Sequence, residues 1–355
     1  MAKISTLYSS WLTSLLVVLA ALAPITSATT TTSATVTRPS GTSPTPSSDS
    51  KRIVQYAGTI YAPGSHQKIR ISELVNSTRP IFATNVLYGT WSLWTNRTMT
   101  IQKDQSNVDP SLPSNAWAFA EMKTVQKAGV KVSMFMRGGW THFNNVSTFN
   151  SYYSVLHDAL RTYGFDGVDM DIEDYTDHNP SAIGLDAVVR LIKRLRADFG
   201  PDFVITLAPV STALAGGSNL SKFSYEALEQ RCGADISWYN VQFYYQPDEL
   251  ASTGSVDAVV AHGWKPERVA VGMMTTPDFP DVWVAFPQVA QTLRRLVRKY
   301  PGLRGVDGFD YYDQKPGGYA NPWEWPRWAA RQLGMGNGTA GASASSGAKM
   351  LAFKA

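Results

Sequence analysis

Eight short apolar runs, separated by segments with helical periodicity, restrict the possible fold of this chain more than any other feature. Many of the runs are apolar at consecutive positions, which is typical of parallel strands buried on both faces. Strands that alternate with helices favour a parallel sheet. The runs lie at Ile53–Tyr56, Ile81–Tyr88, Val130–Arg137, Phe165–Glu173, Phe203–Val210, Ile236–Tyr244, Val269–Thr275 and Val306–Tyr311.

The segments between the runs carry apolar residues at helical spacing. One stripe extends from Leu185 to Leu195, and a second lies within residues 289–297. Eight strand–helix units predict an α/β fold of the (β/α)8 barrel type, which commonly needs about 250 residues. A doubly wound sheet is the alternative, but the Gly-x-Gly-x-x-Gly turn of its dinucleotide-binding form is absent.

The two ends of the chain have compositions that do not favour a packed core. An apolar run followed by small residues predicts a secretory signal at 1–28, with an uncleaved membrane anchor as the alternative. Residues 29–51 are mostly Thr, Ser and Pro and predict an O-glycosylated linker, and residues 334–355 predict a disordered tail. The single catalytic domain is then expected at 52–333.

Charge and cysteine content exclude several classes of protein. A formal net charge of +4 over 355 residues argues against a nucleic-acid partner. Cys232 is the only cysteine, so an intramolecular disulfide is impossible. We expect a secreted, extracellular or cell-wall-associated monomer that leaves the membrane after signal cleavage. Five Asn-x-Ser/Thr sequons fit such a glycoprotein: Asn76, Asn96, Asn145, Asn219 and Asn337.

The chemistry is concentrated in the fourth run, where acids and apolar residues alternate. Because alternate residues of a strand share one face, Asp169, Asp171 and Glu173 should all point into the barrel. Glu173 comes last, at the strand end where barrel enzymes have their active sites. Like charges at close range raise at least one pKa, so we expect Asp169 and Asp171 to share a proton and Glu173 to act as a general acid.

Other interpretations of this segment fit less well. In one alternative, the acids are solvated at a polar strand end. The alternation instead predicts acids buried one above another, which is costly to desolvate unless they have a function. The spacing lacks the turn glycine of an EF-hand loop, so we expect no metal ion and no other cofactor. A serine hydrolase would need a Gly-x-Ser-x-Gly turn, which is absent, and the five histidines are scattered.

The spacing Asp-x-x-Asp-x-Asp-x-Glu resembles the signature of glycoside hydrolase family 18, which includes chitinases and certain endo-β-N-acetylglucosaminidases. Asp166, Asp169, Asp171 and Glu173 fill its four positions. The third, fifth and sixth runs are also similar to strands of that family, and the third leads to the pair Gly138-Gly139. Within the family, the likeness is to secreted fungal endo-β-N-acetylglucosaminidases that cut the chitobiose core of N-glycans.

The resemblance implies a retaining mechanism in which the 2-acetamido group of the sugar is the nucleophile. It implies that Glu173 protonates the leaving oxygen and then activates water, that Asp171 orients the acetamido N–H, and that Asp169 supports Asp171. It also implies a hydrogen bond from Tyr244 to the acetamido oxygen. The sugar site would be lined by Gln242, Phe309, Gly138 and Gly139.

Two positions depart from the family pattern. Met136 stands where a serine is usual, and Phe309 stands where a tryptophan is usual. Phenylalanine stacks under a sugar with less area and without an N–H, and an inward Phe309 would place Asp307 one layer deeper. Two classes of function therefore remain open: a hydrolase, or a catalytically weak, lectin-like protein that binds chitin oligosaccharides.

The connection between the last two runs bears on the choice of substrate. Residues 276–304 are too few for a crossover helix together with an additional α+β subdomain. We therefore expect an open, shallow groove. Such a groove suits attack within a chain and has room for a branched glycan, so we favour an N-glycan or a soluble chito-oligosaccharide over crystalline chitin.

Overall fold

The computed structural model describes residues 51–76, 78–173 and 182–336. The predicted signal segment, nearly all of the linker and most of the tail lie outside the described residues, so those assignments stay predictions.

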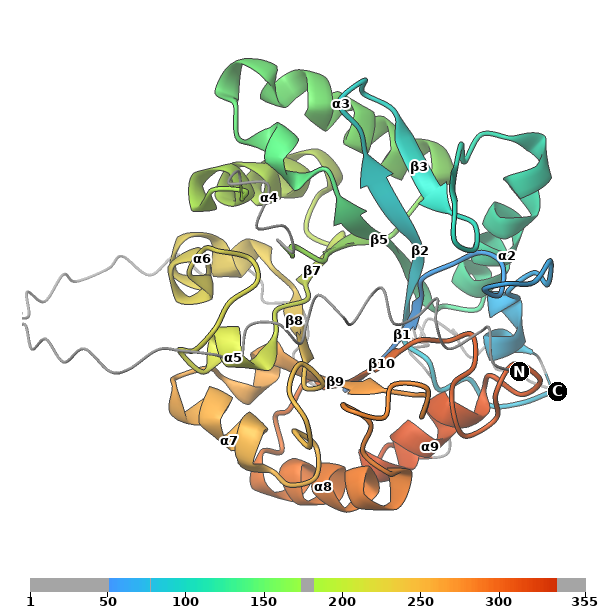
Figure 1. Ribbon diagram of the computed structural model, residues 1–355, viewed down its shortest axis with the longest axis vertical. Coiled ribbons are helices and arrows are strands. Elements are labelled where there is room, and N and C mark those ends of the chain that lie inside the picture. The colour runs from blue at the N-terminus through green and yellow to red at the C-terminus, as the bar shows by residue number, and fades with distance from the viewer. Residues whose placement is uncertain (1–50, 77, 174–181, 337–355) are drawn as a thin grey trace, which may run out of the picture. The chain divides into compact units, whose positions relative to one another are not determined.

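Eight parallel strands form a closed barrel (Figure 1). The barrel closes because its first strand pairs with both the second strand and the last one. The predicted (β/α)8 fold is thus confirmed. In order around the barrel, the strands are β1 (Arg52–Ala57), β2 (Asn85–Leu93), β5 (Lys131–Gly138), β6 (Gly167–Met170), β7 (Val204–Leu207), β8 (Trp238–Gln242), β9 (Val269–Met274) and β10 (Gly305–Phe309).

Helices surround the strands as an outer ring (Figure 1). The two predicted apolar stripes are the buried faces of α4 (Leu185–Phe199) and α8 (Phe286–Lys299). Both helices also carry basic residues in their last turn, where a positive charge interacts favourably with the helix dipole. The helices are α2 (Ala116–Lys127), α3 (Val146–Tyr163), α4 (Leu185–Phe199), α5 (Ser211–Leu214), α6 (Tyr225–Cys232), α7 (Gly254–Ala261), α8 (Phe286–Lys299) and α9 (Glu324–Gln332).

The second strand differs from its predicted range. Residues 81–84 precede the strand, and their apolar character reflects burial without strand pairing, as for Ala83. At its other end β2 continues to Leu93, because it pairs there with an antiparallel strand. That strand is β3 (Met99–Gln102), which in turn pairs with the short β4 (Asn107–Val108).

The alternation of side chains along each strand divides the core into two layers. A large outer layer fills the space between strands and helices and includes Met134, Met136 and Val168. A smaller inner layer fills the barrel with residues from several strands, among them Tyr56 and Phe135. Side chains that alternate with the outer layer therefore point towards the barrel axis.

The connection between β9 and β10 holds α8 and no further strand or helix, as its length predicts. Within the described ranges, no helix combines the length and the apolar character needed to cross a bilayer.

Candidate active site

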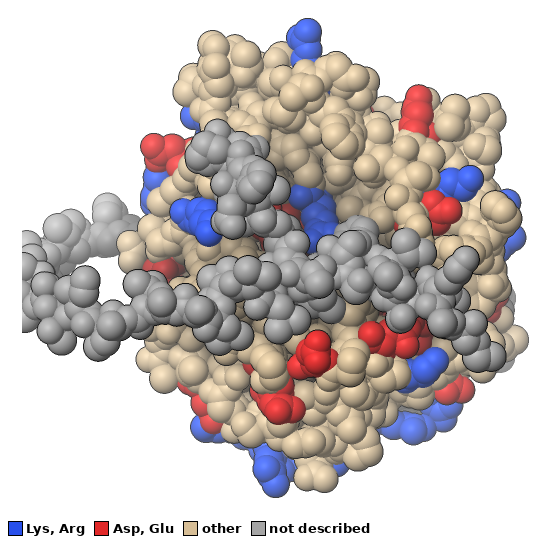
Figure 2. All heavy atoms as spheres, in the orientation of Figure 1, with Lys and Arg blue, Asp and Glu red and all other residues tan. Residues whose placement is uncertain are grey.

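The candidate site lies at the mouth of the barrel, where the C-terminal ends of the strands meet. This face is hollowed at its centre, and both basic and acidic side chains are visible inside the hollow (Figure 2). Active sites of barrel enzymes are built at this end of the strands.

The acidic strand places its carboxylates as the alternation predicts. Asp169 is fully buried within β6, and Asp171 is 5% exposed just beyond its last paired residue. The backbone N–H of Asp171 still donates to the carbonyl of Met136 at 3.0 Å, which extends the strand geometry to this residue. Glu173 follows two residues later, with a side chain that is 5% exposed.

Asp169 is held by three hydrogen-bond donors. Its Oδ1 accepts from Thr206 Oγ1 at 2.6 Å and from Asn240 Nδ2 at 2.9 Å, and its Oδ2 accepts from the Tyr56 hydroxyl at 3.0 Å. Burial raises the pKa of Asp169 to about 6, and these three hydrogen bonds act in the opposite direction. The donors thus hold the carboxyl group in one orientation below Asp171.

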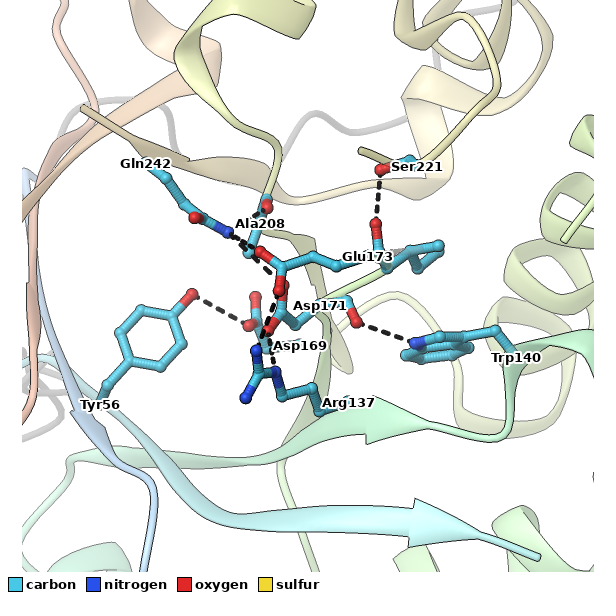
Figure 3. A network of polar contacts seen from close by, with 10 residues as sticks. Tyr56, Arg137, Trp140, Asp169, Asp171, Glu173, Ala208, Ser221 and Gln242 are labelled. Carbon is cyan, nitrogen blue, oxygen red and sulfur yellow. Dashed lines mark hydrogen bonds and ion pairs between the residues drawn. The ribbon is translucent and has the colours of Figure 1, made fainter. Parts of the chain in front are cut away.

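Asp171 and Glu173 are bridged from two sides (Figure 3). From β5, Arg137 places Nε 3.2 Å from Asp171 Oδ2 and Nη2 3.2 Å from Glu173 Oε2. From β8, Gln242 Nε2 donates to Glu173 Oε1 at 2.8 Å and to the carbonyl of Ala208 at 3.0 Å. The same nitrogen lies 3.5 Å from Asp171 Oδ1.

The pKa of Asp171 is governed mainly by burial and by its neighbour Glu173. Burial raises the pKa of Asp171 well above its usual value, and the charge of Glu173 raises it further. Asp169 contributes less, and Arg137 opposes these effects. Glu173 therefore acts on Asp171 more strongly than Asp169 does, while Asp169 accepts hydrogen bonds from three other donors. The sharing of a proton between Asp169 and Asp171 stays a prediction.

An aromatic floor lies across the barrel from β6. Phe309 packs against Tyr244, with ring centroids 6.3 Å apart and nearly parallel planes, and against Tyr56 at 5.8 Å. The inward direction of Phe309 places Asp307 one layer deeper, as predicted. Burial raises the pKa of Asp307 well above its usual value, with a smaller effect from Asp169, which favours the neutral form of this carboxyl group in the barrel interior.

The glycine pair at the end of β5 contacts a neighbouring strand. A Cβ on Gly138 would lie 2.7 Å from Ser92 Oγ, and one on Gly139 would clash with the Leu93 carbonyl. Gly139 also has a φ of +92°, which favours glycine. The close approach of β2 explains why glycine is needed at both positions; that the two residues line the sugar site stays a prediction.

The tight turn at Gly139 leads to Trp140, which stabilises the acidic segment. Its indole Nε1 donates to the main-chain carbonyl of Asp171 at 2.8 Å (Figure 3). On the other side, Ser221 Oγ donates to the carbonyl of Ile172 at 2.7 Å. The backbone that carries Asp171 and Glu173 is therefore fixed from both sides.

Asp166 lies at the opposite end of the same strand. Its Oδ2 accepts hydrogen bonds from Gln126 Nε2 at 2.8 Å and from the backbone N–H of Val132 at 2.9 Å. Lys131 Nζ lies 3.3 Å from its Oδ1. These contacts tie α2, β5 and β6 together at the bottom of the barrel, so Asp166 acts on the fold and not on the site.

Sequence reasoning missed Arg137 and Tyr56, which contact the acids directly. The family pattern directed attention to Met136, whose side chain packs in the outer layer. The signal for Arg137 was its spacing of two from Phe135, a residue of the inner layer. Among the described residues, no group of three or more His, Cys, Asp or Glu side chains has the arrangement of a metal site.

The barrel, with paired acids at the mouth, has the architecture of a glycosidase. Comparison with known proteins specifies the family: the model for glycosyl hydrolases family 18 matches residues 52–277. The chain therefore belongs to glycosyl hydrolases family 18.

Two solved structures are similar over the whole of their own length. A fungal endo-β-N-acetylglucosaminidase of family 18 is 34% identical, with a TM-score of 0.72, and the match covers 81% of this chain and 100% of that one. Chitinase ChiC from Aspergillus fumigatus is 31% identical, with a TM-score of 0.67, and the match covers 80% of this chain and 100% of that one.

A curated relative matches over a shorter segment. Exochitinase 1 of Streptomyces olivaceoviridis is 25% identical over 237 residues, which is 54% of this chain. That segment is 40% of the relative, so the chain spans less than half the length of this larger protein.

Proposed function

We propose that this protein is a secreted, retaining glycosidase that cleaves β-1,4 bonds next to N-acetylglucosamine with assistance from the substrate. The observation that carries the proposal is the pair Asp171 and Glu173, which are almost buried and held side by side at the barrel mouth by Arg137 and Gln242. Such a pair can exchange one proton with a substrate while a negative charge remains beside the reacting sugar.

In the first step Glu173 gives its proton to the leaving glycosidic oxygen. The acetamido oxygen of the same sugar attacks the anomeric carbon, the bond to the leaving group breaks, and a cyclic oxazolinium ion forms. Asp171 accepts the acetamido N–H and stabilises the positive charge, while Asp169 holds position below it. Water then attacks the anomeric carbon, and Glu173 takes up its proton.

The aromatic floor and the amide at the mouth complete the sugar site. Phe309 would lie beneath the ring of the reacting sugar, and the hydroxyl of Tyr244 would donate to the acetamido oxygen. Gln242 would contact the sugar from the side of β8. Gln242 and Tyr244 come from the end of β8, two strands from β6, and Phe309 comes from the end of β10, opposite β6, so together they would surround one sugar.

For the substrate we favour the chitobiose core of N-glycans. The short β9–β10 connection adds no subdomain beside the mouth, which leaves room for a branched glycan. The likeness to the fungal endo-β-N-acetylglucosaminidase supports this choice. Chitin oligosaccharides are the second candidate, because ChiC from Aspergillus fumigatus is similar to a comparable degree.

The products distinguish these functions. The purified chain would be incubated in parallel with chito-oligosaccharides and a high-mannose glycoprotein, and the products would be identified by mass spectrometry. We expect glycans released with one N-acetylglucosamine left on the protein. Shortened chito-oligomers would indicate a chitinase, and retained binding without any product would indicate a lectin.

The sequons provide a test of the proposed secretion. Asn76, Asn96 and Asn145 are exposed, and in each the side-chain oxygen accepts from the backbone N–H and hydroxyl of the Thr or Ser two residues later. Asn219 differs, because its amide nitrogen donates to the carbonyl of Phe223. The hydroxyl of its sequon serine, Ser221, is buried against the acidic segment.

We therefore predict glycans on Asn76, Asn96 and Asn145, and none on Asn219, because a bulky glycan needs an exposed attachment site. The measurement is peptide mapping by mass spectrometry after expression in a eukaryotic secretory host and enzymatic glycan release in H₂¹⁸O. Full modification of Asn219, or no modification of the three exposed sites, would contradict this prediction.

A further inference from the structure

Arg137 places a positive charge directly beside the proposed general acid, Glu173. Its guanidinium forms ion pairs with both Asp171 and Glu173, at 3.2 Å in each case. Its side chain is 23% exposed, and those of the two acids are 8% and 5% exposed. Charges this close and this well covered are screened only weakly by salt, so the guanidinium acts strongly on both carboxyl groups.

Both side-chain oxygens of Glu173 face nitrogen donors. Oε2 faces the Arg137 guanidinium, and Oε1 accepts from the amide of Gln242 at 2.8 Å. Guanidinium and amide nitrogens can only donate. The reaction, however, requires a proton on Glu173. In the resting site, Arg137 and that proton therefore compete for the same pair of carboxyl groups.

Other groups around the pair work against ionisation. Asp169 from β6 adds negative charge and raises the pKa of Asp171. Asp307 from β10 interacts with Asp169, and Tyr56 from β1 donates to Asp169 and interacts more weakly with Asp171. Tyr225 from α6 interacts with both acids of the pair, and Tyr244 after β8 interacts with Tyr56. Arg137 is the cation that lowers the pKa of Asp171.

We propose that Arg137 is a positioning residue that holds Asp171 and Glu173 together in the resting site and sets the upper pH limit of the reaction. The proposal rests on the function proposed above. Because the guanidinium favours the state of the pair without the catalytic proton, the rate should fall at a lower pH than it would without Arg137. The acetamido N–H of a bound substrate would take the place of the Arg137 contact on Asp171.

The test compares pH–rate profiles of the wild type, Arg137→Gln and Arg137→Lys on one substrate. Loss of an adjacent opposite charge should move the alkaline limb of kcat/KM, which reports the free enzyme, upward by about one pH unit or more in Arg137→Gln. Arg137→Lys keeps the charge and is the matched control, so its alkaline limb should stay with the wild type. An equal loss of rate at every pH in Arg137→Gln, or the same shift in both variants, would overturn the proposal.

A second measurement does not depend on turnover. Without Arg137 the folded-state pKa of Asp171 rises further, and an acid with a raised folded-state pKa destabilises the folded protein above its unfolded pKa of about 4. The unfolding midpoint of Arg137→Gln should therefore fall further below that of the wild type as the pH rises above the folded-state pKa of Asp171 in the wild type, which burial and Glu173 hold well above its usual value.

The double variant Arg137→Gln/Glu173→Gln lacks one acid of the pair. The difference between its unfolding midpoint and that of the wild type should therefore grow much less with pH than it does for Arg137→Gln. A deficit that is the same at all pH values would overturn the inference on Arg137. If the wild type cleaves no glycan but the pH-dependent deficit is present, the proposed function fails while the electrostatic role of Arg137 stands.

Discussion

Replacement of Glu173 by glutamine is expected to lower kcat by about 10²–10⁴-fold, because the leaving oxygen then receives no proton. Glutamine has the size of glutamate and can keep a contact with Gln242 or Arg137, which now lie 2.8 Å and 3.2 Å from the carboxylate. The fold should therefore survive. Initial rates on the substrate identified by product analysis, together with the unfolding midpoint, test this expectation.

The same strand offers a matched control in Asp166→Asn. Asp166 belongs to the same acidic motif, but its contacts with Gln126 and Val132 lie at the bottom of the barrel. We expect this variant to lower the unfolding midpoint and to leave kcat at the wild-type value. Wild-type activity in Glu173→Gln, or a large loss of kcat in Asp166→Asn, would contradict the assignment of the acid.

Replacement of Asp171 by asparagine is expected to lower kcat by about 10²–10³-fold, the range typical for loss of one group that stabilises transition-state charge. Asparagine keeps the shape, but it lacks the negative charge that stabilises the oxazolinium ion. The bond from Trp140 reaches the main chain of residue 171 and does not depend on its side chain. The backbone geometry should therefore stay as it is.

Steady-state kinetics separate this effect from a loss of binding. We expect kcat to fall much more than KM changes, because the charge acts on the transition state and less on the bound substrate. The unfolding midpoint should rise slightly or stay constant, since the substitution removes a buried carboxyl group that is repelled by Glu173. A variant with unchanged kcat and a raised KM would show that Asp171 only binds the sugar.

The fold could be predicted from the sequence because burial leaves a strong pattern. Parallel barrel strands are covered on both sides, so each gives an apolar run, and each of the eight runs overlaps one barrel strand. The positions where the strands begin and end were harder to predict from the sequence. Residues 81–84 are apolar because they are covered, whereas β2 continues to Leu93 through pairing with β3, a contact that depends on a turn and not on an apolar run.

The acids could also be predicted, because a spacing of two places them on one face of a strand regardless of how that strand pairs with others. Their partners could not, because Asp169 is held by Tyr56, Thr206 and Asn240 from three other strands. Which side chains meet across a barrel depends on strand register, and the sequence does not display register directly. The alternation of side chains could have predicted that Arg137 points inward. The family pattern instead directed attention to its neighbour Met136.

The most direct test of the central claim is the anomeric form of the first product. Proton NMR during the first minutes of hydrolysis of a high-mannose glycopeptide and of a chito-oligosaccharide would show which anomer of the new reducing end appears first. Attack by the acetamido group of the substrate, followed by water, predicts the β-anomer, with the α-anomer growing later by mutarotation. First appearance of the α-anomer would mean direct attack by water and would contradict the proposed roles of Asp171 and Glu173.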